Sequence, residues 1–455
     1  MRLLEQSFML RVKMSAYIGL FMILAVILLA GCGEEKVIIR YLEVPPPVEL
    51  ISPPIDTFIT TNNPTFQWHT LDQADRYQIQ VSSSPYFISN TINTTTQDTA
   101  YTTVTEISNN TYFWRVRGQN ADTLWGDWSD ADIWTFFKSD YMDYINPISG
   151  IATHGLAQDL FVRGDTAYIA DGQADLTIIN IEDKSNPYII RNVDPMDDDF
   201  ANSIYVAEAD TFPYVFVADT DGRVQVINIA DTTFLYNISF GEQNLLDLDG
   251  GLIDDTLYIF TVRARSGFNL ASMTIYQVVY TPFPRLGDFY FINPIDLPAN
   301  PKGIKCVENY VYVACGEVGL RIIDISDIYN PTAYSDLNLV GVSSAVAIKG
   351  NYAYVAADRA GLYVVNIEDK SNPVKVAQIN TSGRSRDLHI AGDFAFIADG
   401  SGGLKVIDIS VPDSSHFVAA YDTPYANGVW ADGNYVYVCD RDEGLMIFEN
   451  RISRR

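Results

Sequence analysis

A short hydrophobic phrase recurs across the last two thirds of this chain and limits its fold more than any other feature. Each good copy places an aromatic residue before an aliphatic residue, then alanine and aspartate, as in Tyr168–Asp171 and Phe396–Asp399. The aliphatic residue of successive copies stands at positions 169, 217, 259, 313, 355, 397 and 438. A period near 42 residues indicates one supersecondary unit that is copied around or along an axis.

Each unit is predicted to form four short strands joined by tight turns. A short strand such as Asp387–Ala391 precedes the first phrase, and a second apolar phrase such as Gly361–Ile367 follows it. An Asn-Pro pair, as at 372–373, then marks a turn. Apolar pairs such as Val-Val at 364–365 predict sheets that are covered on both faces. These features favour the blades of a β-propeller, with an open β-solenoid as the alternative.

The two ends of the repeat region predict a closed ring. The last unit offers three strands, of which Gly444–Glu449 is the last. Tyr141–Ile148, directly before the first unit, fits the missing fourth strand. Sharing one blade between the two ends pairs edges that otherwise invite aggregation. We count seven blades over residues 141–450, and six blades are the alternative because the third unit, at about 245–297, departs most from the pattern.

These phrases resemble a known repeat family. Gly403–Ile409 and Tyr354–Ala357 look like the LVIVD repeat, which builds propellers in bacterial and archaeal surface proteins. The resemblance covers about 300 of the 455 residues. It implies a β-propeller in an extracytoplasmic setting, but it implies no defined activity and no catalytic residue.

The N-terminus has the pattern of a secretion signal. Arg11 and Lys13 precede an apolar run at 16–29, which is short for a membrane-spanning helix. The run ends in Leu-Ala-Gly-Cys at 29–32, which resembles the lipobox of bacterial lipoproteins. The resemblance implies removal of residues 1–31 and a lipid anchor on Cys32, in the outer membrane of a diderm cell because Gly33 follows. A plain signal peptide is the alternative.

Between this anchor and the repeats we predict a tether and a second domain. Residues 32–48 contain three consecutive prolines, and a proline run is stiff and extended. Residues 49–138 alternate apolar and polar side chains, which predicts a β-sandwich. An early Trp68, the strand Tyr112–Arg117 and a late Trp128-Ser129 resemble a fibronectin type III domain. Tyr112 matches the position of the tyrosine corner, and the tryptophans are expected to pack in the sandwich, with glycan binding as the alternative.

Composition excludes several classes of function. The formal net charge of −27 disfavours nucleic acid and anionic lipid as partners. Beyond Cys32 the chain has Cys306, Cys315 and Cys439, an odd trio that is no disulfide framework, and four scattered histidines without zinc-site spacing. There is no Gly-x-Ser-x-Gly motif and no phosphate loop. We therefore expect buried thiols and no cofactor.

Aspartates in turns offer the one weak metal signal. Two pairs stand before glycine, as they do in calcium loops, but neither continues into a full loop: Asp219 with Asp221, and Asp247 with Asp249. Asp171, Asp219, Asp399 and Asp440 recur at the turn after the second strand of their units. We expect them to cap their own turns through backbone N–H groups, with Ca²⁺ binding as the alternative.

A ring of polar residues is the main candidate site. In a propeller the first strand of each blade lines the central channel. Two residues before its first aliphatic position, six of the blades carry a polar residue: Gln158, Asn202, Lys302, Ser344, Arg386 and Asn427. We expect them to gather at one mouth of the channel, with Arg384 nearby. The cations in an acidic protein suggest an anionic or sugar ligand, and a water-filled polar channel is the alternative.

The sequence thus favours a lipid-anchored, extracytoplasmic, non-enzymatic protein whose propeller presents a surface to a protein or glycan of the cell envelope. Its membrane contact would be the lipid on Cys32. One alternative is a glycan hydrolase or lyase at the channel mouth, which needs two carboxylates at a fixed separation. Carboxylates clustered in the channel would favour that enzyme. A structural envelope component is the third reading, and the ligand and the oligomeric state are not encoded in any motif.

Overall fold

The computed structural model describes the chain over residues 23–27, 38–42, 44–55, 57–84, 86–129, 134–138, 144–193, 200–207, 214–229, 234–239, 244–264, 271–278 and 289–452. These residues form strands and one short 3-10 helix, Pro412–Ser414, so the all-β class is confirmed. Strands β1 (Ile23–Ile27) and β2 (Ile38–Leu42) pair antiparallel. Cys32 lies outside the described residues. None of the described segments is a helix long and apolar enough to cross a membrane.

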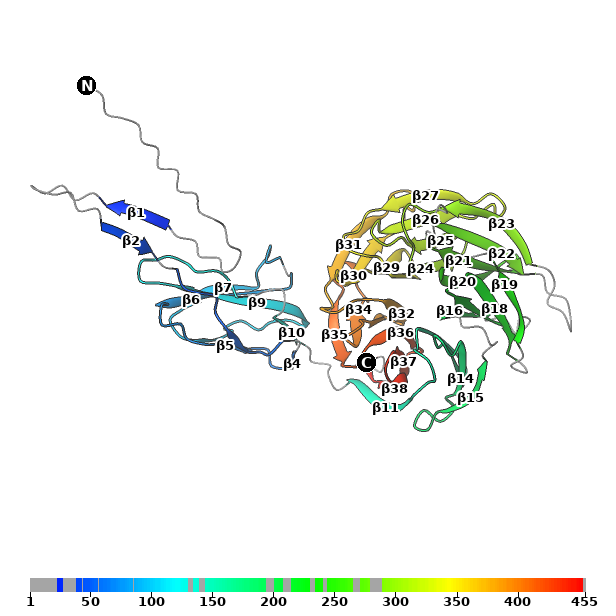
Figure 1. Ribbon diagram of the computed structural model, residues 1–455, viewed down its shortest axis with the longest axis horizontal. Helices are drawn as coiled ribbons and strands as arrows, with labels where there is room; N and C mark the ends of the chain where they lie inside the picture. Colours follow the sequence, from blue (N-terminus) through cyan, green and yellow to red (C-terminus); the bar gives the residue numbers. More distant parts are fainter. Residues whose placement is uncertain are drawn as a thin grey trace, which may run out of the picture.

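Residues 44–138 fold into two facing sheets (Figure 1). One sheet has three strands: β3 (Leu50–Ser52), β5 (Thr65–Trp68) and β8 (Ala100–Thr102). The other has five strands in the order β4 (Thr57–Ile59), β10 (Thr135–Lys138), β9 (Asn110–Gln119), β6 (Arg76–Ser82) and β7 (Ile92–Thr96). Burial alternates along β5, as the sequence pattern predicts, whereas consecutive residues are buried in parts of β6 and β9.

Aromatic side chains fill the space between the two sheets. The rings of Phe66 and Trp114 lie 5.1 Å apart, and Trp68 packs edge-on against Tyr77 at 5.7 Å. The hydroxyl of Tyr112 donates to the carbonyl of Ser108 at 3.1 Å, which ties the start of β9 to the preceding loop. These contacts hold the sandwich together through burial of large apolar area.

The proline run is not wholly a tether. Val48 is only 4% exposed and belongs to the core of the sandwich. Pro45 is buried beside Gly118 and Gly126, where an added Cβ on Gly126 would stand 2.1 Å from the Pro45 carbonyl oxygen. The sandwich therefore begins a few residues before the predicted boundary at 49, because two glycines leave room for the chain to pack against them.

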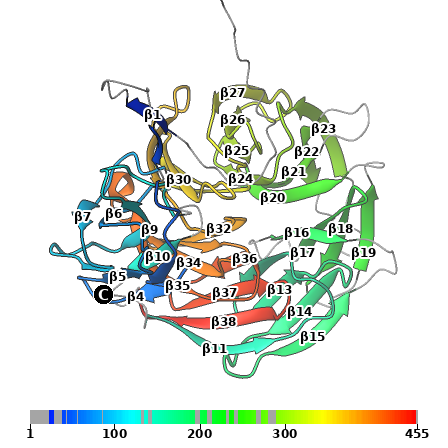
Figure 2. The ribbon, with the colours of Figure 1, turned by 60° about the vertical axis from the view of Figure 1, so that its left-hand side comes forward.

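The described residues from Tyr144 onward form seven four-stranded antiparallel sheets arranged as the blades of a propeller (Figures 1 and 2). The first sheet contains β12 (Asp159–Arg163), β13 (Thr166–Ala170), β14 (Leu176–Asn180) and β15 (Tyr188–Val193). The second contains β16 (Ala201–Val206), β17 (Tyr214–Asp219), β18 (Arg223–Asn228) and β19 (Phe234–Ser239). The third contains β20 (Leu245–Ile253), β21 (Thr256–Arg263), β22 (Ser272–Val278) and β23 (Phe289–Asp296).

The next three sheets have shorter and more regular strands. The fourth sheet contains β24 (Gly303–Val307), β25 (Tyr310–Ala314), β26 (Leu320–Asp324) and β27 (Thr332–Leu337). The fifth contains β28 (Ala345–Lys349), β29 (Tyr352–Ala356), β30 (Leu362–Asn366) and β31 (Val374–Ile379). The sixth contains β32 (Asp387–Ala391), β33 (Phe394–Ala398), β34 (Leu404–Asp408) and β35 (His416–Tyr421). The first strand of each sheet lies against the first strands of its two neighbours, and β12 also contacts β36 of the last sheet. The first strands therefore surround a central channel.

The last sheet joins the two ends of the repeat region. It contains β36 (Ala426–Ala431), β37 (Tyr435–Asp440) and β38 (Gly444–Asn450), and its fourth strand is β11 (Ile145–Ile151). β11 runs antiparallel to β38. Figure 2 shows β38 between β37 and β11. The strand predicted at 141–148 thus begins at 145 within the described residues and extends three residues further.

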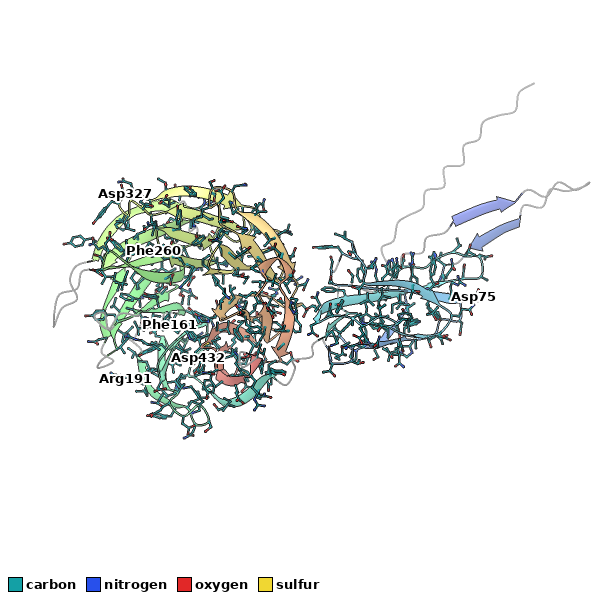
Figure 3. The ribbon with its side chains drawn as sticks, turned by 180° about the vertical axis from the view of Figure 1, so that it is seen from behind. Asp75, Phe161, Arg191, Phe260, Asp327 and Asp432 are labelled. Atoms are coloured by element: carbon teal, nitrogen blue, oxygen red, sulfur yellow. The ribbon has the colours of Figure 1, made fainter. Side chains whose placement is uncertain are left out.

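The two middle strands of each blade carry the core, whereas the fourth strand is largely exposed in β15, β27 and β31 but buried in β35. Tyr354 and Val355 on neighbouring positions of β29 are 1% and 0% exposed, so both faces of the sheet are covered. On β15, by contrast, Tyr188 is 57% exposed. Exposed charges such as Arg191 and Asp327 lie at the periphery of the propeller (Figure 3). The apolar pairs of the second phrase therefore reflect burial between adjacent blades.

Candidate functional site

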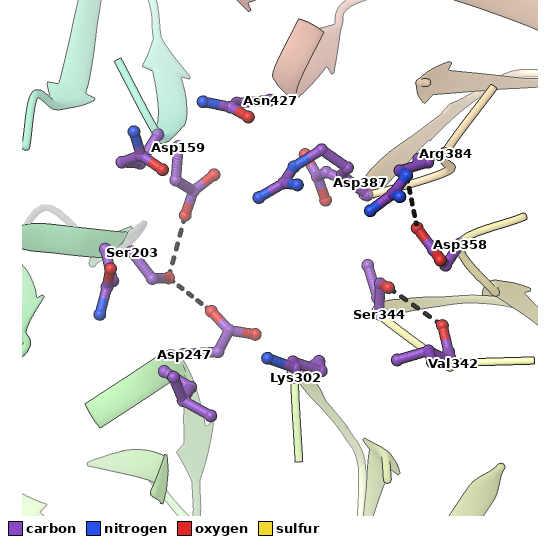
Figure 4. Close-up of a pocket in the computed structure, with 15 residues that line it drawn as sticks. Asp159, Ser203, Asp247, Lys302, Val342, Ser344, Asp358, Arg384, Asp387 and Asn427 are labelled. Carbon is purple, nitrogen blue, oxygen red and sulfur yellow. Dashed lines mark hydrogen bonds and ion pairs between the residues drawn. The ribbon is translucent and has the colours of Figure 1, made fainter. Parts of the chain in front are cut away.

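All six residues of the predicted ring line one cavity of about 460 Å³ at a mouth of the channel. They come from six of the seven blades, and Leu246 occupies the corresponding place in the third. Figure 4 shows Asn427, Lys302 and Ser344 around this cavity, together with Arg384 and Asp358. The ring was predictable because the first strands of all blades start at the same end of the channel.

Two amides of the ring connect neighbouring blades. Asn202 donates to the carbonyl of Leu245 at 2.7 Å, and Asn427 donates to the carbonyl of Ala157 at 2.8 Å. Asn427 is only 6% exposed. Its amide oxygen accepts no hydrogen bond from any described residue. A buried acceptor without a donor costs about 1–3 kcal/mol, so this oxygen is a place where a ligand donor would be favoured.

The cations of the mouth lie on its rim. Lys302, Arg384 and Arg386 are exposed and line the cavity. The Nε atom of Arg384 is 4.0 Å from a carboxylate oxygen of Asp358, a long and exposed ion pair that contributes little stability. Arg386 lies over the ring of Tyr425 at 5.6 Å. The rim is therefore positive and polar, as the sequence predicts.

Three carboxylates lie one residue deeper, and the sequence analysis did not single them out as a group. Asp159, Asp247 and Asp387 line both the mouth cavity and a second cavity on the other side of them, so they form the waist of the channel. The signal was present, since each directly precedes the first aliphatic residue of its strand. Asp247 had been considered only as a weak Ca²⁺ ligand.

Each waist carboxylate also binds the backbone of the next first strand. Asp159 accepts the N–H of Ile204 at 3.0 Å. In the same way Asp247 accepts from Ile304 at 2.8 Å, and Asp387 accepts from Val429 at 2.9 Å. Every one of these carboxylates therefore has a structural role, because it satisfies a donor on the first strand of the neighbouring sheet.

Ser203 joins two of these carboxylates through one hydroxyl (Figure 4). Its oxygen lies 2.9 Å from Asp159 and 2.5 Å from Asp247. A hydroxyl has one proton to donate, so both contacts are favourable only when one carboxyl group is protonated. Solvent reaches these groups through the channel, but burial and then the charge of Asp387 raise the pKa of Asp159. Burial and then Asp159 raise the pKa of Asp247. The pair is therefore suited to hold one proton.

The second cavity, of about 540 Å³, has an aromatic wall. Phe161 lies 4.3 Å from Trp430, which stacks on His389 at 4.2 Å. Burial lowers the pKa of His389 to about 3, so the imidazole is neutral and accepts the N–H of Ala431. Opposite this wall, Lys305 forms an ion pair with Asp249 at 3.1 Å. This end of the channel is apolar on one side, with its charges already paired on the other.

The turn aspartates are occupied by hydrogen bonds within their own units. Asp399 accepts from the Thr381 and Ser385 hydroxyls and from the N–H of Gly383 at 2.6–2.9 Å. Asp440 accepts the N–H groups of Asp442 and Glu443 and so caps its own turn, as predicted. Asp171, like Asp399, instead binds the loop before the first strand, where it accepts the N–H of Gly155 at 3.0 Å.

The two aspartate pairs considered for Ca²⁺ have other partners. Asp219 caps the turn that contains Asp221, and Asp221 lies 3.3 Å from Arg223. Asp247 and Asp249 face the channel and bind the next blade. Nowhere in the part of the chain that the structure describes do three or more His, Cys, Asp or Glu residues group as metal ligands.

The outer tryptophans of the sandwich are stacked against arginines. The guanidinium of Arg117 lies 4.8 Å from the Trp125 ring and 4.4 Å from the Trp128 ring, and Arg115 lies 4.3 Å from Trp128. Gln78 accepts two hydrogen bonds from Arg117 and fixes its plane. Cation–π stacking thus occupies ring faces that sugar binding would need, which favours strand-face packing over the glycan alternative.

The thiols of Cys306, Cys315 and Cys439 form no disulfide bond with one another. Burial raises the pKa of the Cys315 thiol to about 12.

The fold and its ring of first strands define a β-propeller. The model of the LVIVD repeat matches residues 154–195, 300–337, 340–381, 382–423 and 425–448, so five of the sheets contain segments that match the LVIVD repeat. The second and third sheets lie outside the matched segments. The third sheet contains β20 and β21, with nine and eight residues, whereas the strands of the fourth sheet have five or six.

Solved structures agree on the fold. The crystal structure of the Myceliophteria thermophila Cps50 (Swd1) β-propeller domain is 10% identical, covers 67% of this chain and 99% of its own, and has a TM-score of 0.54. The RRP9 WD40 repeats are 9% identical, cover 68% of this chain and 97% of their own, and have a TM-score of 0.54. At such identities the likeness shows the fold alone. No curated protein matches the chain.

Proposed function

We propose that this protein is a lipid-anchored, extracytoplasmic, non-enzymatic binding protein with a seven-bladed LVIVD propeller on a fibronectin type III-like spacer. The seven four-stranded sheets support the blade number. The three-on-five sheet arrangement and the Tyr112–Ser108 hydrogen bond support the spacer assignment. The lipobox at 29–32 supports the anchor on Cys32.

The observation that carries the binding function is the convergence of polar side chains at one mouth of the channel. Six ring residues and five further charged residues meet around about 460 Å³, and no described residue donates to the buried amide oxygen of Asn427. Such a concave site with a few convergent polar groups is the form that small-ligand sites take. A protein or glycan of the envelope would place one charged or hydroxylated group there.

Binding is tested with the mature chain and the double variant Lys302→Ala plus Arg386→Ala. The panel holds acidic and neutral oligosaccharides, followed by cross-linking to envelope proteins on intact cells. A partner bound by the wild type should bind the double variant at least tenfold more weakly. Lys349→Ala is the matched control, because Lys349 ends a first strand at the opposite end of the channel. Equal binding by all three chains would overturn the role of the mouth, and no partner at all would favour a structural component.

The anchor is tested separately. A Cys32→Ala variant should lose incorporation of labelled fatty acid and should leave the detergent-rich phase in a phase-partition experiment. Equal partition of the variant and the wild type would contradict lipidation and favour the plain signal peptide.

One observation favours a second candidate function, a glycan hydrolase or lyase. The three waist carboxylates cluster in the channel, and burial raises the pKa of Asp387, as general acids require. Their bonds to backbone N–H groups explain the cluster structurally, so binding stays our first proposal. Release of reducing ends from envelope glycans by the wild type, and its loss in Asp159→Asn and Asp387→Asn, would establish the enzyme instead.

A further inference from the structure

The charges of the channel mouth are separated in depth. The cations Lys302, Arg384 and Arg386 line the mouth cavity but not the cavity beyond the waist, which Asp159 and Asp387 also line. Lys302 in addition lines a neighbouring cavity beside Glu317. Among the described residues that line the mouth, the remaining acid at the rim is Asp358, which pairs with Arg384. A molecule that enters this mouth therefore meets positive charge first and negative charge below it.

A second and independent observation points to a donor on the ligand. The amide nitrogen of Asn427 is committed to the Ala157 carbonyl, and this bond fixes the orientation of the amide. Its oxygen is left without a donor beside the waist, at a residue only 6% exposed. An N–H or O–H group at this depth would satisfy an acceptor that the protein leaves unsatisfied.

The formal charges at the mouth also balance. Its lining holds three cations and four aspartates, and the single hydroxyl of Ser203 favours one shared proton between two of those aspartates. A ligand with a large net charge of either sign would leave a surplus of that charge at the mouth. A ligand that carries one positive and one negative group would leave no such surplus.

From these observations we infer that the mouth binds a small zwitterion, a molecule with an ammonium group and a carboxylate, such as an amino acid. The ammonium group donates to Asp387, Asp159 and the Asn427 oxygen at the waist. The carboxylate stays at the rim, where Arg386 and Lys302 hold it. This assignment rests on the proposed binding function and specifies the ligand class of the same site.

The test measures the affinity of the mature chain for α- and ω-amino acids by calorimetry, with 5-aminopentanoate as the reference probe. Pentylamine and pentanoate are its two matched halves. We expect at least one amino acid to bind at least tenfold more tightly than either half, because both ends of the site are then occupied. Equal binding of a zwitterion and one of its halves, or no binding of any amino acid, would overturn the inference.

Variants test the orientation. Arg386→Ala should weaken binding of the zwitterion at least tenfold and leave pentylamine binding unchanged. Asp387→Asn, which keeps an acceptor for the Val429 N–H, should weaken both. Lys349→Ala should change neither, and the opposite pattern for Arg386 and Asp387 would contradict the stated orientation.

The outcomes also separate this inference from the proposed function. If no amino acid binds but an oligosaccharide or envelope protein binds through Lys302 and Arg386, the zwitterion is wrong and the binding function stands. If nothing binds in a way that depends on the mouth, both are wrong.

Discussion

At the scale of single residues, each waist aspartate faces a small residue of the next blade. Asp247 bonds to the N–H that follows Gly303, and Asp387 bonds to the N–H that follows Gly428. Asp159 bonds to the N–H that follows Ser203. An added Cβ on Gly303 or Gly428 would meet the backbone of the following first strand, at the carbonyl oxygens of Ser344 and Gln158, so the neighbouring blade requires a small residue there.

Asp247→Asn should change how the free energy of unfolding depends on pH. Burial and the Asp159 charge raise the pKa of Asp247, so the folded state keeps a proton that the unfolded chain releases near pH 4. Stability from this group is therefore present below about pH 4 and falls as pH rises towards the raised pKa. Relative to the wild type, the variant should gain stability as pH rises above about 4, by about 1.4 kcal/mol per unit of raised pKa.

Urea unfolding at several pH values measures this difference. The control is Asp413→Asn, which changes an exposed aspartate of the short 3-10 helix and should leave the pH dependence unaltered. Parallel stability curves for the wild type and Asp247→Asn would show that no proton is held at the waist.

The turn aspartates show the same coupling between residues. Where the turn carries Asp171, the third strand provides Thr177, whose hydroxyl donates to that carboxylate at 2.8 Å. Where the turn carries Ala357, the third strand provides Tyr363, which instead donates to the Val340 carbonyl. The partner of the polar side chain on the third strand thus changes with the residue at the turn, as expected when most buried polar groups are hydrogen-bonded.

At the scale of elements, the first strands approach one another closely. An added Cβ on Gly303 of β24 would stand 2.6 Å from the Ser344 carbonyl oxygen and 2.8 Å from the Cα of Ala345 in β28. Both atoms are backbone and cannot rotate away. Glycine at this position therefore sets the spacing between two blades.

Gly303→Ala should destabilise the propeller by about 1–3 kcal/mol, because the new methyl group forces two first strands apart. Gly150→Ala in β11 is the matched control, since its added Cβ would meet the Leu445 carbonyl oxygen at an ordinary 3.5 Å. Chemical unfolding of both variants measures the difference. A loss for Gly303→Ala no larger than that of Gly150→Ala would contradict the close approach.

At the scale of the whole molecule, the ring is closed by hydrogen bonds between its two ends. β38 pairs with β37 on one side and with β11 on the other. Leu445, Ile447 and Phe448 of β38 are fully buried. Burial of each such side chain contributes about 1.5–3 kcal/mol, so β38 carries a large part of the stability of a typical domain.

Removal of residues 444–455 should therefore open the ring and produce an aggregating chain with exposed edges on β37 and β11. Removal of 453–455 alone should leave the melting temperature unchanged within about 2 °C. Addition of a peptide with residues 444–452 should restore the thermal transition of the shortened chain. A soluble shortened chain with the melting temperature of the wild type would contradict closure through β38.

Much of this architecture was predictable because it follows local rules. The phrase around Val355 repeats with a fixed period, each copy forms one strand, and identical units must pack in identical ways. The closing strand was predictable because the last unit lacked a partner for β38. The end of the tether was not predictable, because Pro45 packs against Gly118 and Gly126, which lie far along the chain.

The sequence by itself therefore determined the class of fold, the strand order within each blade and the residues at the channel mouth. Those follow from periodicity, which acts between neighbours in the chain. The tertiary structure alone decided that Asp159, Asp247 and Asp387 meet at one waist, that Ser203 stands between two of them, and that the Asn427 oxygen lacks a donor. These contacts join residues of different blades, and their hydrogen bonds and pKa values depend on distances that no local pattern encodes.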